Sequence, residues 1–175
     1  MIKYITKLAL TLLVITSLVA AVLAGVNAIT EPVILRLNEE KTQQAIEAVL
    51  PGGGQPLELE DTTGLIKAAY VSDTGYAVQV EPSGFDGEID MMVGVSKDGK
   101  VLGISIISHT ETAGLGAVAA AKTSAGEAFR GQFSNTDAPF AVGSNIDALT
   151  GATITSKAVT SGINAAVEFV KEVQG

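Results

Sequence analysis

The sequence has no cysteine and no tryptophan, and it holds a single histidine, His109, among 175 residues. Without cysteine, the chain forms no disulfide and binds no iron–sulfur cluster through thiolates. A single histidine also excludes a haem or zinc site built on several imidazoles. With neither thiol nor indole, the polypeptide offers little redox chemistry of its own. Any electron transfer by this chain therefore requires a bound cofactor.

Charged residues are also scarce, at 17% of the chain, and none lies between Lys7 and Glu31. Residues 8–28 are apolar apart from a few Thr, Ser and Asn residues. About 20 helical residues cross the roughly 30 Å hydrocarbon core of a bilayer, so we predict a transmembrane anchor in residues 1–30. A cleaved signal peptide is an alternative, although its apolar region usually has only about 7–15 residues. A buried core helix is a weaker alternative, because no other apolar segment is long enough to cover it.

The charges on either side of the anchor predict its orientation. Lys3 and Lys7 precede the apolar run, and cationic flanks stay on the cytoplasmic side. Residues 31–175 are then expected outside the cytoplasm, on the periplasmic or extracellular face. They carry nine Lys and Arg residues against all nineteen Asp and Glu residues, a net charge of 9 − 19 = −10. Such a surface repels phosphate backbones, which argues against a nucleic-acid partner.

The remaining residues predict one α/β domain, 31–175, with an antiparallel or mixed sheet of about four to six strands. Glu31 and Pro32 suit the start of a helix, predicted over 31–50 as a stalk that ends at Pro51. Four runs are expected as strands: 66–72, 76–82, 91–96 and 101–108. Asp98 and Gly99 predict a tight hairpin between the last two. Helices are expected from 117 to 130 and, with an apolar stripe, from 155 to 173.

The start of the last predicted helix is the segment richest in polar groups. Residues 147–157 carry several side-chain oxygens and the Lys157 ammonium, and Gly151 lets the backbone approach a bound group closely. The free N–H groups and positive end of the helix favour an anion such as phosphate. The alternative is ordinary helix capping, in which a Thr or Ser oxygen accepts a backbone hydrogen bond. The residues alone leave both interpretations open.

The same segment resembles the flavinylation motif of the FMN-binding domain family. In that motif an Asp and two variable residues precede Ser or Thr, Gly, Ala and Thr, and an apolar residue and Ser or Thr follow. Asp147, Thr150-Gly151-Ala152-Thr153 and Ile154-Thr155 match every position. The resemblance implies that Thr153 is esterified to the phosphate of FMN. It also implies that a separate flavin transferase makes this bond from FAD and releases AMP.

A second, distant segment strengthens the first. His109-Thr110-Glu111-Thr112-Ala113-Gly114-Leu115-Gly116 is similar to a His-x-Glu-Thr-Pro-Gly-Leu-Gly segment. That segment occurs in the G subunit of Rnf complexes and in the related C subunit of sodium-pumping NADH:quinone oxidoreductases. Ala113 stands where proline is usual, which loosens the loop. The short length of the chain favours the Rnf G subunit.

The resemblance implies a set of FMN-binding residues and no catalytic or metal-binding residue. Glu111 is a candidate partner of the flavin ring or its ribityl hydroxyls, against the alternative of a solvated loop carboxylate. Lys157 is a candidate for neutralising the phosphodiester. The full set is Thr153, Asp147, Thr150, Gly151, Ala152, Thr155, Ser156 and Lys157, with His109, Glu111, Thr112, Gly114 and Leu115.

The function implied by the resemblance is electron relay without independent catalytic activity. The partners would be the other subunits of a membrane complex, one of which also carries covalent FMN. Such a complex passes electrons between reduced ferredoxin and NAD while it moves Na⁺ or H⁺. One alternative is a stand-alone, membrane-anchored flavin sensor or extracellular electron-transfer module. Another is a structural anchor without redox activity, in which Thr150-Gly151-Ala152-Thr153 only caps a helix.

Overall fold

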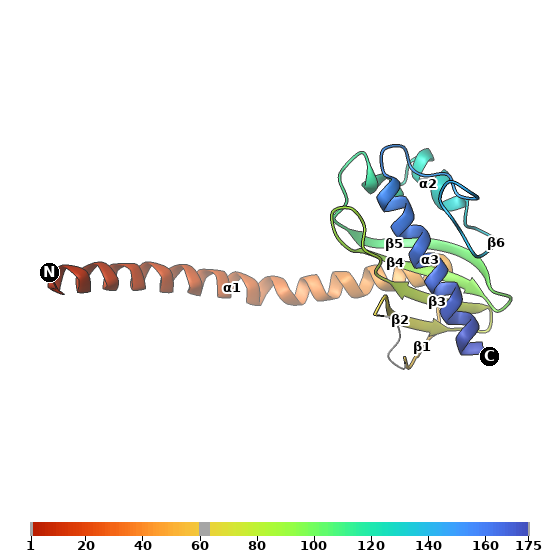
Figure 1. Cartoon of the computed structure of the whole chain (residues 1–175). Coiled ribbons are helices and arrows are strands. Elements are labelled where there is room, and N and C mark those ends of the chain that lie inside the picture. The colour runs from red at the N-terminus through yellow and green to blue at the C-terminus, as the bar shows by residue number, and fades with distance from the viewer. Residues whose placement is uncertain (1, 60–63, 175) are drawn as a thin grey trace. The chain divides into compact units, whose positions relative to one another are not determined.

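Within the residues that the structure describes, one long helix precedes six strands and three further helical segments (Figure 1). The computed structural model describes residues 2–59 and 64–174. They fall into two units divided between Glu40 and Lys41. We call the second unit, from Lys41 onward, the body.

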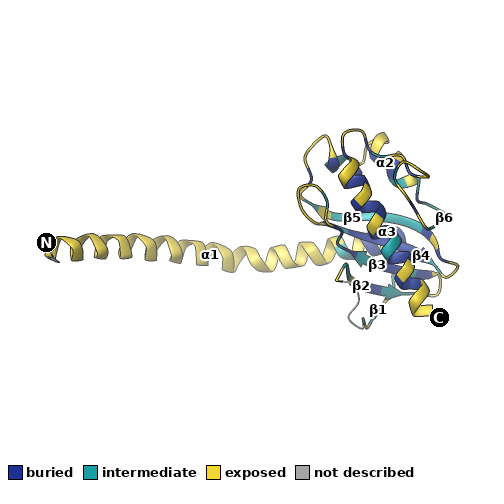
Figure 2. Cartoon of the chain, in the orientation of Figure 1, coloured by how far each residue is buried: buried dark blue, intermediate teal, exposed yellow. Residues whose placement is uncertain are grey.

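The first unit consists of the N-terminal part of helix α1, Ile2–Val49. Residues 3–40 are exposed throughout (Figure 2). An 18-residue window of this helix has a mean hydropathy of 2.5 with none of it buried, so the helix is long and apolar enough to cross a membrane. The expectation of a separate helix opening at Glu31 and Pro32 is wrong, because α1 runs through Pro32 without interruption. Proline removes one helical hydrogen bond, and the helix on either side of it keeps its own bonds.

The body contains a six-stranded antiparallel sheet whose strands pair in chain order. Its strands are β1 (Gln55–Leu57), β2 (Ile66–Val71), β3 (Gly75–Val80), β4 (Ile89–Ser96), β5 (Lys100–His109) and β6 (Thr136–Asp137). Strands β2 to β5 confirm the four predicted runs, and the β4–β5 hairpin turns at the predicted glycine, Gly99, where φ is +81°. Strands β1 and β6 are too short to leave a hydrophobic pattern in the sequence.

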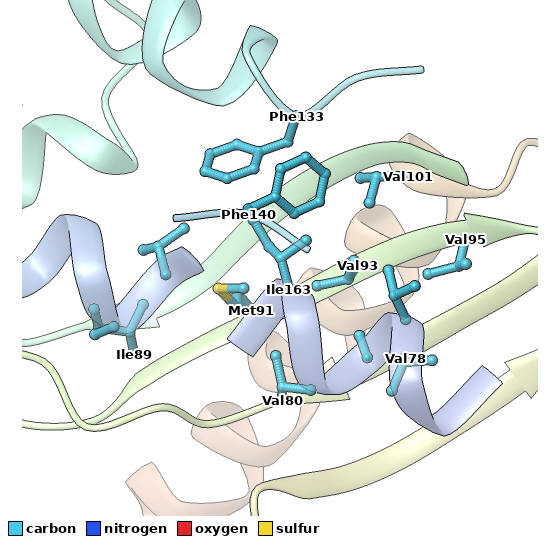
Figure 3. Packing of buried hydrophobic residues seen from close by; sticks show 14 of the residues in the cluster. Val78, Val80, Ile89, Met91, Val93, Val95, Val101, Phe133, Phe140 and Ile163 are labelled. Atoms are coloured by element: carbon cyan, nitrogen blue, oxygen red, sulfur yellow. The ribbon is translucent and has the colours of Figure 1, made fainter. Parts of the chain in front are cut away.

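Both faces of the sheet are covered, which explains why the central strand β4 is buried along most of its length. Helix α3, Thr153–Gln174, covers one face (Figure 1). Figure 3 shows Ile163 of α3 beside Met91 and Val93, and the Phe133 ring meets the Phe140 ring edge-on at 5.2 Å. The opposite face packs against the end of α1 through Ala45, Ile46, Val49, Leu50, Ala77 and Met92. The last turns of the predicted stalk thus belong to the core of the body.

One predicted helix is split in two. Residues 117–130 were expected as a single helix, but they form a 3-10 segment η1, Gly116–Ala119, and helix α2, Ser124–Gly131. The break occurs because Thr123 caps α2, where its Oγ1 accepts a hydrogen bond from the Gly126 N–H at 3.3 Å. The Arg130 guanidinium then donates to the carbonyls of Ala119 and Ala121 and holds the two segments together.

Candidate functional site

The start of α3 is fixed by a buried serine. The Ser156 Oγ accepts a hydrogen bond from the Leu149 N–H and donates one to the Ala152 carbonyl, both at 2.9 Å. Between these two residues the chain turns through Gly151, whose φ of +73° favours glycine. Ser156 thereby ties the turn of residues 149–152 to the helix that follows. Its hydroxyl is fully engaged in this turn and lies beneath the surface.

Thr153 is the first residue of α3 and is exposed. Among the residues that the structure describes, nothing accepts a hydrogen bond from the N–H groups of Thr153, Ile154 or Thr155, and the Thr153 hydroxyl has no partner. The first turn of α3 also carries no acidic residue. Three free N–H groups at the positive end of a 22-residue helix favour an anion beside Thr153.

The second segment is held against this helix start by Glu111, which is only 7% exposed. One carboxylate oxygen, Oε1, accepts hydrogen bonds from the N–H groups of Phe85 and Asp86 at 2.7 and 3.2 Å. The other, Oε2, accepts one from the Thr155 hydroxyl at 2.6 Å. Glu111 therefore joins three segments: the loop of residues 84–87, its own loop, and the first turn of α3.

The hydrogen bonds to Glu111 also set its protonation. Burial raises the pKa of Glu111, whereas the Thr155 hydroxyl, the two backbone N–H groups and the charge of His109 lower it. The net result is a pKa below the ordinary value for glutamate. Glu111 is thus a bound, ionised carboxylate. It is not the solvated loop carboxylate considered from the sequence.

Two glycines make room for this carboxylate. A Cβ at Gly116 would collide with Glu111 Oε2 and would lie 2.6 Å from Thr155 Oγ1. A Cβ at Gly84 would collide with Glu111 Oε1. The carboxylate is therefore enclosed between the backbones of two loops, and neither loop tolerates a larger residue without moving it.

A cavity of about 310 Å³ opens beside Thr153. That volume lies at the lower end of the range of about 300–1,000 Å³ usual for ligand pockets. Its rim carries three exposed apolar side chains, Phe85 (67% exposed), Leu115 (45%) and Ile154 (53%). The rest of its wall is formed by Glu111, Thr112, Gly116, Gly151, Ala152, Thr153 and Thr155. The cavity thus combines an apolar rim with the open N-terminal end of α3.

The structure brings most of the predicted site residues together, in two adjoining cavities. Seven line the cavity beside Thr153: Thr153, Gly151, Ala152, Thr155, Glu111, Thr112 and Leu115. Gly114, Asp147 and Thr150, with Leu115 again, line a neighbouring cavity of about 530 Å³ against α2.

The other predicted residues lie apart from these cavities. Ser156 is buried below the turn, and Lys157 faces a separate hollow next to Phe140. His109 ends β5, and its buried Nδ1 has no hydrogen-bond partner among the described residues. Sequence reasoning missed Phe85. An aromatic residue between two glycines, Gly84 and Gly87, was the available signal.

Comparison with known proteins gives two further findings. The FMN-binding domain family matches residues 84–168, which contain the loop of Phe85 and both motifs. The G subunit of the proton-translocating ferredoxin:NAD(+) oxidoreductase complex of Clostridium ljungdahlii is 48% identical over 107 residues, which cover 57% of this chain and 55% of that protein.

Two other relatives match along almost their whole length. The G subunit of the Na(+)-translocating ferredoxin:NAD(+) oxidoreductase complex of Acetobacterium woodii is 33% identical, over 98% of this chain and 94% of its own. The G subunit of the ion-translocating oxidoreductase complex of Methanosarcina acetivorans is 31% identical, over 99% and 98%. With an FMN-binding domain behind an N-terminal helix that is able to span a membrane, the chain belongs to the family of G subunits of Rnf-type ion-translocating ferredoxin:NAD oxidoreductase complexes.

Proposed function

We propose that Thr153 carries FMN through a phosphoester bond and that the protein relays electrons within a membrane-bound ferredoxin:NAD⁺ oxidoreductase complex. The observation that carries this proposal is the start of α3. Thr153 there presents a hydroxyl without a partner among the described residues, beside three free N–H groups and a cavity with an apolar rim. The complete flavinylation motif around Thr153 supports the bond, and the related G subunits support the setting.

The residues present fit the cofactor in their chemistry. The N–H groups of Thr153, Ile154 and Thr155 suit a phosphodiester anion. The apolar side chains of Phe85 and Leu115 suit the flat ring system of a flavin. A separate flavin transferase would make the bond, with FAD as the donor of the FMN group. In that reaction the Thr153 Oγ1 would bond to the flavin-side phosphorus while the pyrophosphate P–O bond breaks, AMP would leave, and the hydroxyl proton would pass to water. The chain gains FMN less one water.

Bound FMN supplies one- or two-electron exchange. The protein's part is to hold and orient the group. Glu111 is the only ionisable side chain among the described residues that line the cavity beside Thr153. Both of its oxygens already accept hydrogen bonds, which leaves it poorly placed to transfer a proton to a substrate. This supports relay in preference to turnover of a small molecule.

The proposal also assigns location and partners. Lys3 and Lys7 favour a cytoplasmic N-terminus, which puts residues 31–175 outside the cytoplasm behind the anchor of residues 1–30. The partners are the other subunits of the complex, including a second membrane subunit with covalent FMN. Because the chain has no native cysteine, a Ser144→Cys variant tests the orientation. A membrane-impermeant thiol reagent added to intact cells should label this cysteine. Labelling only after lysis would show that the body lies in the cytoplasm.

Intact mass under denaturing conditions tests the bond to Thr153. The wild-type chain, co-expressed with a flavin transferase, should carry the mass of FMN less water, and Thr153→Ala should lose it. Thr123→Ala is the matched control, because Thr123 also stands at a helix start but caps it. This control should keep the flavin. A flavin mass retained by Thr153→Ala would refute the attachment.

A further inference from the structure

Glu111 is a buried carboxylate that forms no ion pair among the described residues. The described residues contain two ion pairs, Arg36–Glu40 and Lys67–Glu81, and neither involves Glu111. Without an ion-pair partner, a buried carboxylate stays charged where hydrogen bonds replace its lost hydration. Three donors do this here: the N–H groups of Phe85 and Asp86 and the hydroxyl of Thr155. The negative charge is therefore retained without a counter-charge in its hydrogen-bonded shell.

The position of this charge is fixed from several sides. Its donors lie 25 or more residues away in the sequence and belong to two different segments. The Thr110 hydroxyl adds a second link to the same loop, because it donates to the Asp86 carbonyl at 2.8 Å. The backbones of Gly84 and Gly116 lie close against its two oxygens, since a Cβ on either glycine would collide with one of them. These contacts hold the carboxylate in the wall of the cavity beside Thr153.

We propose that Glu111 is a positioning residue of the flavin site whose fixed negative charge lowers the reduction potential of the FMN on Thr153. This inference rests on the proposed function. An electron added to a group beside a fixed anion meets electrostatic repulsion, and a partly buried setting screens that repulsion less than water does. The other described residues that line the cavity are uncharged, so their side chains do not offset it.

His109 is the ionisable side chain whose charge contributes to the lowered pKa of Glu111. The segments that hold Glu111 also carry Asp86, His109 and Lys157. Of these, His109 contributes a charge effect that lowers the pKa of Glu111, while Asp86 acts through its backbone N–H. Glu111 is therefore ionised at neutral pH, and its charge acts on the flavin under ordinary conditions.

The decisive variant is Glu111→Gln in the flavinylated full-length protein. The amide keeps the shape of the side chain: its oxygen accepts from the N–H groups of Phe85 and Asp86, and its NH₂ donates to the Thr155 hydroxyl. Redox titration at pH 7 should show a more positive midpoint potential than in the wild type. Glu127→Gln, the same change at an exposed acid in α2, should leave the potential unchanged. A wild-type potential in folded, flavinylated Glu111→Gln would overturn the inference.

A second variant, Thr155→Val, keeps the charge and removes one donor. Loss of the hydroxyl raises the pKa of Glu111. Protonation of Glu111 removes its negative charge and so raises the midpoint potential of the flavin as the pH falls. In Thr155→Val this rise should begin at a higher pH than in the wild type. Superimposable curves of potential against pH would overturn the inference even if Glu111→Gln fails to fold. A pH 7 shift in Thr155→Val as positive as that in Glu111→Gln would show that geometry alone sets the potential, which also overturns it.

These outcomes are separable from failure of the proposed function. A wild-type chain without the flavin mass refutes attachment at Thr153 before any potential is measured. A flavinylated wild type with an unchanged Glu111→Gln potential refutes only the role of Glu111.

Discussion

The two helices α2 and α3 both begin at a threonine-containing turn, but they use their free N–H groups differently. At α2, Thr123 accepts a hydrogen bond from the Gly126 N–H, and Glu127 lies in the first turn. At α3, the N–H groups of Thr153, Ile154 and Thr155 have no acceptor among the described residues, and the first turn has no acid. Among the described residues, one of the first three N–H groups of α2 is capped by a side chain, whereas none of the first three of α3 is.

The difference shows what separates a cap from an anion site in this molecule. A cap needs an oxygen at the residue before the helix, and Ala152 occupies that place in α3. The acidic residue at the start of α3 comes from a distant segment: Glu111, 44 residues away in the sequence, accepts a hydrogen bond from the Thr155 hydroxyl. That carboxylate bonds a side chain and leaves the N–H groups free. Substitutions at or around the acid at the α3 start, two of them matched by a control in α2, test this difference.

Gly116→Ala should have the largest effect, because the new Cβ meets both Glu111 Oε2 and Thr155 Oγ1. Overpacking of this kind typically costs about 1–3 kcal/mol. Chemical denaturation should show that loss, and flavin incorporation should fall with it.

The control for this change is Gly131→Ala at the end of α2, where a Cβ meets nothing within 4 Å. Its effect should be within about 1 kcal/mol and favourable. Equal free energies of unfolding for the two variants would mean that the close packing around Glu111 does not contribute to stability.

Ile154→Glu gives the start of α3 an acid of its own, like that of α2. The new carboxylate competes with the phosphate for the helix end and repels it, by an amount on the order of 1.4 kcal/mol, or about tenfold in flavin incorporation. Time courses of flavinylation with intact-mass detection measure this. Ser124→Glu places the same charge on the exposed first residue of α2 and should leave incorporation unchanged. Wild-type rates in Ile154→Glu would show that the open N–H groups play no part in attachment.

The sequence predicted the parts of this comparison that depend on local pattern. The apolar stripe of α3 and the Asp98-Gly99 turn are regular features, and both helix α3 and the β4–β5 hairpin are confirmed. The start of α3 differed by two residues, because Thr153 precedes the stripe and is exposed. The sequence could not distinguish helix capping from anion binding at residues 147–157. The two differ in whether a side-chain oxygen reaches the N–H groups of the helix start, which depends on the folded geometry.

What the sequence did not predict depends on contacts between distant segments. Glu111 bonds Phe85 across 26 residues, and nothing local to either residue indicates the pair. The break in residues 117–130 depends on Thr123, whose side chain competes with helix continuation. Helix α1 continues through Pro32 although Glu31 and Pro32 suit a helix start, because both neighbouring stretches favour helix.

The smallest expected effect is the pH dependence of stability that comes from Glu111. Its pKa in the folded protein is lowered, chiefly because the Thr155 hydroxyl and the N–H groups of Asp86 and Phe85 outweigh burial. A lowered pKa means that the ionised group stabilises the fold at pH values above the unfolded pKa of about 4.3. As the pH falls through the lower, folded pKa, that contribution disappears.

Melting temperatures of the wild type and Glu111→Gln, recorded from pH 7 to pH 3, measure this contribution. The melting temperature of the wild type should exceed that of Glu111→Gln by a constant amount down to about pH 4.3, and this difference should disappear below that value. Glutamine cannot titrate, so the difference between the two curves isolates Glu111 from every other acid in the chain. A difference that stays constant to pH 3 would mean that Glu111 joins the α3 start by shape alone. The charge of Glu111 would then not contribute to stability, and α2 and α3 would differ only in the presence or absence of a cap.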